Sequence, residues 1–292
     1  MTFSQQQFEA ALKVVQSDLA DWIEFGETPL LSSLYTFNTT ASTNRTLWEL
    51  LDQGAAPGTV AIAAQQVAGR GQWGREWQSP LGGLYLSIAL APDLPVENSA
   101  QLTLCSAWGI AIALRHYGIP VQLKWPNDLV LLGRKLGGIL TETRIQQGQI
   151  TKAVIGVGIN WANPVPETGI NLQDFLAGQG TSTVMPSTNP PIASLEMLAA
   201  IALTGLLGGY QYWQQEGMET LLPSYLELLT SVGCPVTVEG RSGVVVGVST
   251  TGDLRVRFPT VSDSSSDSLI APLAAPAAEI YCKPGTIRLG YG

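Results

Sequence analysis

The chain has 292 residues, of which 45% are hydrophobic and 13% are charged. This composition excludes an intrinsically disordered chain, which needs few apolar residues and many charges. The formal net charge is −8 at pH 7, so a broad basic surface for DNA or RNA is excluded and any anion site must be local. The length fits one large domain, alone or with a small companion.

Targeting and membrane segments are not evident. The first 20 residues contain charged side chains and lack a continuous apolar run after a basic start, so they do not resemble a secretory signal. Two uncharged stretches, 98–114 and 197–213, approach the length of a membrane span but contain polar residues and glycines. We therefore expect a cytoplasmic protein whose cysteines are reduced and packed, namely Cys105, Cys234 and Cys282.

The spacing of apolar residues predicts helices and strands in alternation. In chain order we expect a helix before residue 25, a strand at 34–37, a helix that begins near Ser42 and ends before Gly54, and a buried strand at 59–65. An apolar strand at 84–91 and a long buried helix at 99–117 follow. Further strands are expected at 121–125, 129–132, 136–143 and 152–160, and two or three helices at 192–229.

After residue 231 the composition shifts to Val, Gly, Ser and Thr in short alternating runs. Strands are predicted at 236–238, 243–248, 254–258 and 279–282, a pattern typical of a small β-barrel. A serine-rich run at 262–268 is expected to be a flexible loop within it.

A glycine-rich segment follows the strand at 59–65. Gly69-Arg70-Gly71-Gln72-Trp73-Gly74 matches the dinucleotide fingerprint Gly-x-Gly-x-x-Gly. That interpretation requires a helix that begins at the third glycine, and the Pro- and Gly-rich sequence at 78–83 excludes one. Two interpretations remain open: a loop whose arginines bind phosphate or carboxylate, and an ordinary surface turn.

The basic residues of this acidic chain are concentrated in two windows. Residues 69–75 and 124–135 contain five of the 15 Lys and Arg residues, where an even distribution would place about one. We infer a local site for a polyanion. A third segment, 153–160, is a strand whose glycines would allow close approach of a ligand or another backbone, or simply tight packing.

Six motifs in this order resemble those of biotin protein ligases. They are Ser42-Thr43-Asn44, Gln66 with Gly69-Arg70-Gly71 and Gly74-Arg75, Trp77-Gln78-Ser79-Pro80, Lys124-Trp125-Pro126-Asn127-Asp128, Lys135-Leu136-Gly137-Gly138, and Gly156-Val157-Gly158-Ile159-Asn160. The resemblance implies an α+β fold: a catalytic domain of the class II synthetase-like type, with a mixed β-sheet and packed helices, plus a C-terminal SH3-like barrel. It implies a helical N-terminal extension at 1–33, a catalytic domain at 34–230 and the barrel at 231–292, as in monofunctional ligases without a DNA-binding domain.

The resemblance also implies a two-step reaction. The biotin carboxylate attacks the α-phosphorus of ATP to give biotinyl-5′-AMP and pyrophosphate, and an acceptor lysine then attacks the mixed anhydride. ATP and biotin are the expected substrates, with Mg²⁺ accompanying ATP. The expected partner is the biotin carboxyl carrier protein of acetyl-CoA carboxylase, with no nucleic acid and no membrane; a homodimer stays open.

Candidate site residues follow from the matched motifs. The catalytic candidates are Lys135, Arg70, Asp128 and Lys124. The biotin-binding candidates are Ser42, Thr43, Asn44, Gln66, Gly69, Arg70, Gly71, Gln72, Trp77, Lys135, Gly138 and Gly158. The nucleotide-binding candidates are Arg70, Arg75, Lys124, Asn127, Lys135 and Asn160. The sequence identifies no metal ligands.

The residue types fit these roles. Bringing a carboxylate to a phosphate opposes like charges, so fixed cations such as Arg70 and Lys135 are required. The neutral ureido ring of biotin needs matched donors and acceptors, which the polar residues 42–44 and Gln66 supply. Asp128 is a candidate to orient or deprotonate the acceptor amine, although a turn-forming role for the 127–128 pair stays open.

Two departures from the family pattern are visible. Many members have Gly-Arg-Gly-Arg in the glycine-rich loop, whereas this chain has Gln72 at the second basic position. The tryptophan that some members stack on adenine has no clear counterpart, because Gly169 or Ile170 falls there. Two alternative functions also stay open: a lipoyl or octanoyl ligase of related fold, and a non-catalytic regulator that binds biotin.

Overall fold

The computed structural model describes residues 3–20, 31–179, 192–259, 278–287 and 289–290. The helices are α1 (Gln5–Asp18), α2 (Thr43–Asp52), α3 (Ala100–His116), α4 (Leu172–Gln179) and α5 (Leu195–Leu228). The strands are β1 (Ser33–Thr40), β2 (Thr59–Gln66), β3 (Leu84–Leu90), β4 (Leu94–Pro95), β5 (Gln122–Lys124), β6 (Asp128–Leu131), β7 (Arg134–Gln146), β8 (Gln149–Ile159), β9 (Pro235–Val238), β10 (Arg241–Val248), β11 (Leu254–Arg257) and β12 (Glu279–Cys282).

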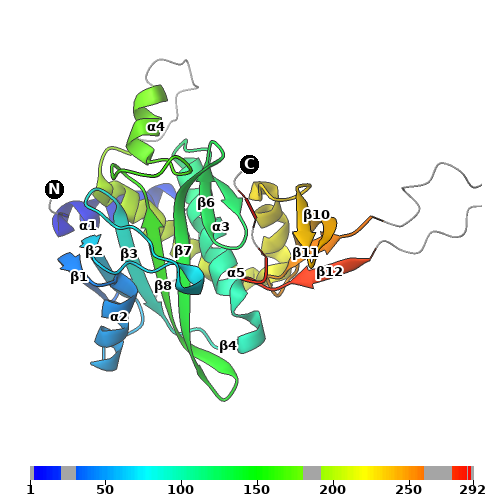
Figure 1. The fold of residues 1–292 in the computed structure, drawn as a ribbon. Coiled ribbons are helices and arrows are strands. Elements are labelled where there is room, and N and C mark those ends of the chain that lie inside the picture. Colours follow the sequence, from blue (N-terminus) through cyan, green and yellow to red (C-terminus); the bar gives the residue numbers. More distant parts are fainter. Residues whose placement is uncertain (1–2, 21–30, 180–191, 260–277, 288, 291–292) are drawn as a thin grey trace, which may run out of the picture.

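An eight-stranded mixed sheet forms the centre of the fold (Figure 1). Its order is β1-β2-β3-β8-β7-β6-β5, and β4 pairs with β8 off this path. Strands β1 and β2 are parallel, and the other neighbours are antiparallel. The expected α+β class with a mixed sheet and packed helices is therefore confirmed.

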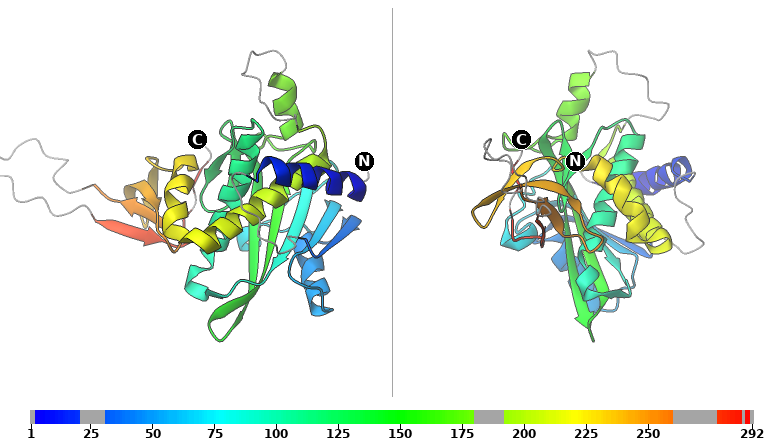
Figure 2. Two further views of the ribbon diagram at one scale, coloured as in Figure 1. Left: turned by 180° about the vertical axis from the view of Figure 1, so that it is seen from behind. Right: turned by 90° about the vertical axis from the view of Figure 1, so that its right-hand side faces the viewer.

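Helices cover both faces of this sheet. On one face α3 packs along α5, and α1 lies against α5 (Figure 2). The apolar side chains of these helices join those of β3, β7 and β8 in the main core. On the other face, α2 packs over β2, β3 and β8 through a smaller core that includes Leu47, Leu51 and Ala61. The rest of that second face stays available for a site.

The first predicted helix is confirmed as α1. Its spacing of about four residues places Phe8, Leu12 and Val15 on one side, where all three are buried in the main core. The helix begins after Ser4, whose Oγ accepts a hydrogen bond from the backbone N–H of Gln7 at 3.3 Å. The part of the prediction beyond residue 20 lies outside the described residues.

Helix α3 and the first half of α5 are apolar nearly all round, which is typical of buried helices. They approach closely at glycines: a Cβ on Gly109 would overlap the carbonyl oxygen of Gly205, and a Cβ on Gly209 would overlap that of Cys105. Within α5, Gly217 has φ 79° and ψ 169°, so the segment consists of two helices. This agrees with the predicted two or three. In the described part of the chain, every helix is too short or too polar to cross a membrane.

The C-terminal strands form a separate antiparallel sheet of order β12-β11-β10-β9. All four strands agree with the prediction, so a C-terminal β-unit is confirmed. Its closure into a barrel stays a prediction. The serine-rich run at 262–268 lies outside the described residues. This sheet contacts the N-terminal end of α3, where Gln101 Nε2 donates to the carbonyl oxygen of Thr250 at 2.7 Å.

Two features differ from expectation. Helix α4 was not predicted, because its eight residues contain too few apolar positions to show a helical period. Cys234 is exposed rather than packed, since it lies in the turn before β9; Cys105 and Cys282 are buried as expected.

Candidate functional site

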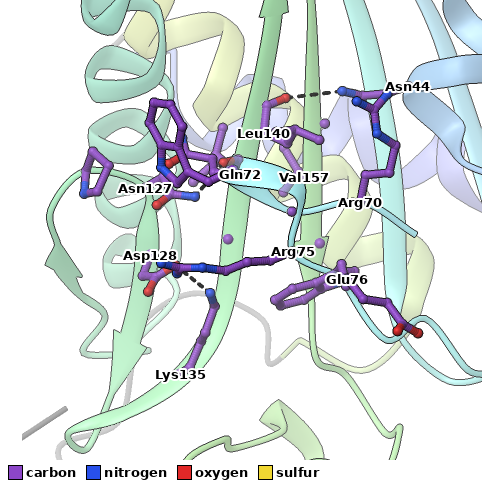
Figure 3. Close-up of a pocket in the computed structure, with 18 of the residues that line it drawn as sticks. Asn44, Arg70, Gln72, Arg75, Glu76, Asn127, Asp128, Lys135, Leu140 and Val157 are labelled. Atoms are coloured by element: carbon purple, nitrogen blue, oxygen red, sulfur yellow. Dashed lines mark hydrogen bonds and ion pairs between the residues drawn. The ribbon is translucent and has the colours of Figure 1, made fainter. Parts of the chain in front are cut away.

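A cavity of about 340 Å³ opens on the sheet face that α2 shares (Figure 3). It is lined by the N-terminus of α2, the glycine-rich loop after β2, the β5–β6 turn, strands β7 and β8, and the C-terminal segment after β12. Every candidate residue from the sequence lines this cavity except Gly69 and Asn160. Segments more than 240 residues apart in sequence, at 42–44 and 285–289, thus meet at one place.

One end of the cavity is polar and neutral. The side-chain oxygen Oε1 of Gln66 accepts from the backbone N–H of Thr43 at 2.7 Å and from its hydroxyl at 3.2 Å. The amide nitrogen of Gln66 donates to Ser79 Oγ at 2.7 Å. These bonds fix the first turn of α2 against the end of β2, so the polar groups of residues 42–44 face the cavity in a set orientation.

Asn44 is the centre of a buried network beneath this end. Its Nδ2 donates to the carbonyl oxygen of Leu140 at 3.3 Å (Figure 3). The same nitrogen donates to Glu142 Oε2 at 2.9 Å. Its Oδ1 lies 2.6 Å from the hydroxyl of Ser87, which is also 2.7 Å from Thr43 Oγ1. The carboxylate of Glu142 in turn pairs with Arg70 Nη1 at 2.9 Å. The glycine-rich loop is therefore tied to the polar end of the cavity.

Sequence reasoning missed Glu142 and Ser87. A signal was available for each, because side chains alternate along a strand. Glu142 lies two and four residues after Leu140 and Gly138, which face the cavity. Ser87 is the hydroxyl in the otherwise apolar run of β3 and is fully buried. A buried polar residue on a strand needs partners, and here they belong to the site.

The other end of the cavity is cationic. Lys135 Nζ lies 2.6 Å from Asp128 Oδ1 and 5.2 Å from the ring centre of Trp77. Arg75 extends across the cavity in the direction of Asp128 (Figure 3). Burial lowers the pKa of Lys124, Asp128 opposes that shift, and the positive charges of Lys135 and Arg75 add to it. Two lysines and one arginine thus surround one carboxylate.

The glycines of β8 accommodate side chains of the protein itself. A Cβ on Gly156 would overlap Asn44 Oδ1, and a Cβ on Gly158 would lie 2.5 Å from Trp77 Nε1. That indole nitrogen is buried without a hydrogen-bond partner in the described part of the chain. These two glycines therefore allow tight packing, the second alternative considered from the sequence, and the groups that approach are the side chains of Asn44 and Trp77, which form the cavity wall.

The glycine-rich loop is a short hydrogen-bonded hairpin. The N–H of Gly71 donates to the carbonyl oxygen of Arg75 at 2.7 Å, and that of Trp77 donates to Gly69 at 3.0 Å. A single 3₁₀ turn, Gln72–Gly74, forms the tip, and Arg75 after it is extended. The absence of a helix after the third glycine confirms that the dinucleotide interpretation does not apply.

Gly69 and Asn160 support the cavity from behind. Gly69 is buried, and a Cβ there would overlap the carbonyl oxygen of Trp77. Asn160, expected at the nucleotide, is instead buried behind the wall, where its Nδ2 donates to the carbonyl oxygens of Lys135 and Ile170, each at 3.3 Å. The hydrogen bond from Asn160 to the Lys135 carbonyl oxygen fixes the backbone of Lys135, whose side chain lines the cavity. Asn127 does line the cavity, and its Nδ2 also donates to the Ile139 carbonyl oxygen at 2.8 Å.

The C-terminal segment supplies a wall that sequence reasoning did not anticipate. Gly285, Ile287 and Leu289 line the cavity. The unit they follow is attached to the site loop, because Trp125 Nε1 donates to the carbonyl oxygen of Gly252 at 2.9 Å. The local sequence of these residues does not predict a site, because they reach the cavity only through the packing of the second sheet against the β5–β6 turn.

Comparison with known proteins agrees with this arrangement. A family model described as the biotin/lipoate A/B protein ligase family matches residues 36–160. A bifunctional ligase/repressor BirA from Bacillus subtilis is 39% identical over 122 residues, which are 41% of this chain and 38% of that protein. A biotin–[acetyl-CoA-carboxylase] ligase from Paracoccus denitrificans is 28% identical over 237 residues, covering 75% of this chain and 92% of that one. The chain thus spans less than half the length of the first of these relatives.

Solved structures show the same fold. The biotin protein ligase from Aquifex aeolicus, solved in complex with biotin and ATP, superposes with a TM-score of 0.61 at 26% identity and covers 77% of this chain and 92% of that chain. The matched family model spans α2, the glycine-rich loop and strands β5 to β8, which carry both ends of the cavity. The region that carries both ends of the cavity, residues 36–160, is thus similar to the biotin/lipoate A/B protein ligase family, and the fold is that of a biotin protein ligase.

Proposed function

We propose that this protein is a biotin–protein ligase. It would use ATP to convert biotin to biotinyl-5′-AMP and then transfer the biotinyl group to a lysine of a biotin carboxyl carrier protein. One observation carries the proposal: a single cavity has a neutral polar network at one end and clustered cations around Asp128 at the other. This division matches a substrate with a neutral ring at one end and a carboxylate at the other.

The polar end suits the ureido ring. Buried oxygen and N–H groups of a ligand need partners of the opposite kind, because an unpaired buried polar group costs about 1–3 kcal/mol. The hydroxyls of residues 42 and 43 can donate or accept. The amide nitrogen of Asn44 is engaged by Glu142 and Leu140, but its Oδ1 keeps a second acceptor position beside Ser87. The indole of Trp77 supplies apolar surface for the hydrocarbon part of biotin.

The cationic end suits the first chemical step. A carboxylate oxygen of biotin forms a bond to the α-phosphorus of ATP, and the bond to the bridging oxygen breaks, so that pyrophosphate leaves with its electron pair. Negative charge accumulates between the two reactants. The ammonium of Lys135 and the guanidinium of Arg75 can stabilise that charge in a site where water is partly excluded. Arg70 lines the same cavity and would contribute by exchanging its pair with Glu142 for the phosphate.

Asp128 fits the second step. The acceptor ammonium must lose a proton before its nitrogen can attack the acyl carbon and release AMP. The carboxylate of Asp128 lies at the cavity wall and is held by Lys135 at 2.6 Å. We therefore propose that it orients the incoming amine or accepts its proton. The side chain of Asn127, the neighbour of Asp128 in the same turn, donates to the carbonyl oxygen of Ile139 on β7 and so links the β5–β6 turn to that strand.

We expect magnesium to arrive with ATP. Of the described residues that line the cavity, only Glu76 and Asp128 are carboxylates, and Asp128 is paired with a lysine. These donors fit an ion that is held mainly by phosphate oxygens and water. ATP is abundant in the cytoplasm, where the proposed reaction would take place.

The nearest rival is a lipoyl or octanoyl ligase, because the matched family includes such enzymes. A lipoyl chain has no ureido group and would offer no hydrogen-bond partner to the polar residues 42–44. A non-catalytic biotin-binding regulator is the other alternative. It would bind biotin without releasing pyrophosphate.

Pyrophosphate exchange tests the proposal. The protein is incubated with ATP, Mg²⁺, labelled pyrophosphate and, in separate reactions, biotin, lipoate or octanoate. Label should enter ATP only with biotin. Exchange with lipoate or octanoate would favour the rival ligase, and binding of biotin without any exchange would favour the regulator.

A further inference from the structure

The tip of the glycine-rich loop carries an unusual tryptophan. Trp73 has φ 60° and ψ 36°, a left-handed conformation that bulky residues rarely adopt, and 62% of its surface is exposed. An aromatic side chain that is both strained in its backbone and open to solvent requires a reason for its position.

The partner of this ring is a glycine of the C-terminal segment. A Cβ on Gly285 would lie 2.7 Å from Cε2 and from Cζ2 of Trp73, closer than side chains tolerate. Gly285 also has φ +92°, where a side chain would be strained. Only glycine therefore allows this segment to lie against the indole ring.

This contact joins the glycine-rich loop to the C-terminal segment at the edge of the cavity. Trp73 and Gly285 both line the cavity, together with Ile287 and Leu289 beyond the glycine. The other end of the loop is tied down by Arg70, which pairs with Glu142 at 2.9 Å. The hairpin between these points is short and internally hydrogen-bonded, so it can swing away from the cavity only if the ring leaves Gly285.

The residue next to Trp73 makes this contact more important. Gln72 lines the cavity but carries no charge, so this position of the loop has no ionic attraction for an adenylate. An apolar contact between the loop and the C-terminal segment can keep the loop closed in place of that ionic attraction, because it does not depend on the charge of the ligand.

We propose that Trp73 is a positioning residue that clamps the glycine-rich loop onto Gly285 and thereby slows escape of a bound acyl-adenylate. The identity of that ligand rests on the proposed function; the clamp itself does not. Opening of the clamp would expose the activated acyl group to the acceptor amine. Loss of the ring should accelerate ligand escape by about tenfold, equivalent to about 1.4 kcal/mol.

The clamp is first tested without any ligand. Trypsin should cut after Arg70 and Arg75 when the loop opens, at a rate set by the open population. Cutting is compared in wild type, Trp73→Ala, Trp73→Phe, Gly285→Ala and the double variant. Gly240→Ala is the matched control, because Gly240 has φ +78° but nothing within 4 Å of a Cβ.

The result expected is faster cutting in Trp73→Ala and in Gly285→Ala, near-complete rescue in Trp73→Phe, and no change in Gly240→Ala. The double variant should be little faster than either single variant, since both remove one contact. Equal cutting in Trp73→Ala and wild type, or full additivity of the two substitutions, would overturn the clamp.

The second measurement uses synthetic biotinyl-AMP, so it does not depend on catalysis. Its dissociation rate should rise about tenfold in Trp73→Ala and Gly285→Ala and recover in Trp73→Phe. An unchanged rate would reject the role in retention. If wild type does not bind biotinyl-AMP, the proposed function fails, and the proteolysis result still decides whether the clamp exists.

Discussion

Lys135 and Asp128 form an ion pair of 2.6 Å across two strands whose register is irregular. Strand β6 pairs Leu129 with Gly137 but Val130 with Lys135, so Leu136 is an extra residue on β7. Such a bulge reverses the alternation of side chains along the strand. It places Lys135 on the same side as Gly138, although the two are an odd number of positions apart, and both line the cavity.

Replacing Lys135 should therefore impair the first chemical step. In Lys135→Ala, single-turnover formation of biotinyl-AMP should fall by about 10²–10³, by analogy with removal of other transition-state partners. Biotin affinity should change much less, because the charge that Lys135 faces develops only as the carboxylate reaches phosphorus. Calorimetry with biotin alone provides the comparison, and an unchanged single-turnover rate would remove Lys135 from the mechanism.

Asn44 should be important for both stability and biotin binding. It is 2% exposed and bonds to Glu142 and Leu140, with Ser87 at 2.6 Å. In Asn44→Ala, these buried groups lose a partner, and the free energy of unfolding in urea should fall by about 1–3 kcal/mol.

The adjacent Arg45 offers a control, since its ion pair with Glu49 is exposed. Arg45→Ala should change the free energy of unfolding by at most about 1 kcal/mol and leave biotin affinity intact. Similar losses in both variants would contradict the importance of the buried network.

Gln72→Arg should slow release of the intermediate. The substitution adds a cation to a loop position that lines the cavity, and a charge-assisted hydrogen bond contributes about 1.5–3 kcal/mol. Dissociation of biotinyl-AMP should be slower by about tenfold or more. Labelling of lysines on an unrelated bystander protein should decrease in parallel. Identical release rates in both proteins would show that this position does not hold the intermediate.

Close packing of α3 on α5 should make Gly109 intolerant of a side chain. A Cβ there would overlap the backbone of Gly205, so Gly109→Ala should lower the free energy of unfolding by about 1–3 kcal/mol. Gly178 in α4 is the matched helical control, because none of the described residues lies within 4 Å of its Cβ position. Gly178→Ala should be neutral or stabilise by up to about 1 kcal/mol. Thermal unfolding distinguishes the two, and equal melting temperatures would refute the packing argument.

The three cysteines should differ sharply in reactivity. Burial raises the pKa of the Cys105 thiol to about 12 and also raises that of Cys282. Only the thiolate reacts, so at pH 8 a disulfide reagent should modify exposed Cys234 and leave the other two intact in the folded protein. Mass spectrometry identifies the labelled residue. Rapid labelling of Cys105 without denaturant would contradict the described burial.

Local sequence determined most of the secondary structure. The apolar spacing in α1 indicated which face of that helix is buried. The nearly uniform apolar character of α3 and of the first half of α5 indicated that these helices are buried all round. The concentration of cations in windows 69–75 and 124–135 also indicated two of the segments that line the cavity. These signals can be read within a short segment, because the positions that face the core recur every three to four residues in a helix and every two in a strand.

Tertiary structure alone decided how those motifs meet. The bulge at Leu136 turns Lys135 toward the cavity, whereas simple alternation would have placed it opposite Gly138. Asn160 lies behind the wall rather than at it, and Gly285 reaches the loop from a separate sheet. Each outcome depends on pairing between segments distant in sequence. Such pairings are fixed by register and packing across the whole fold, and no spacing within one segment encodes them.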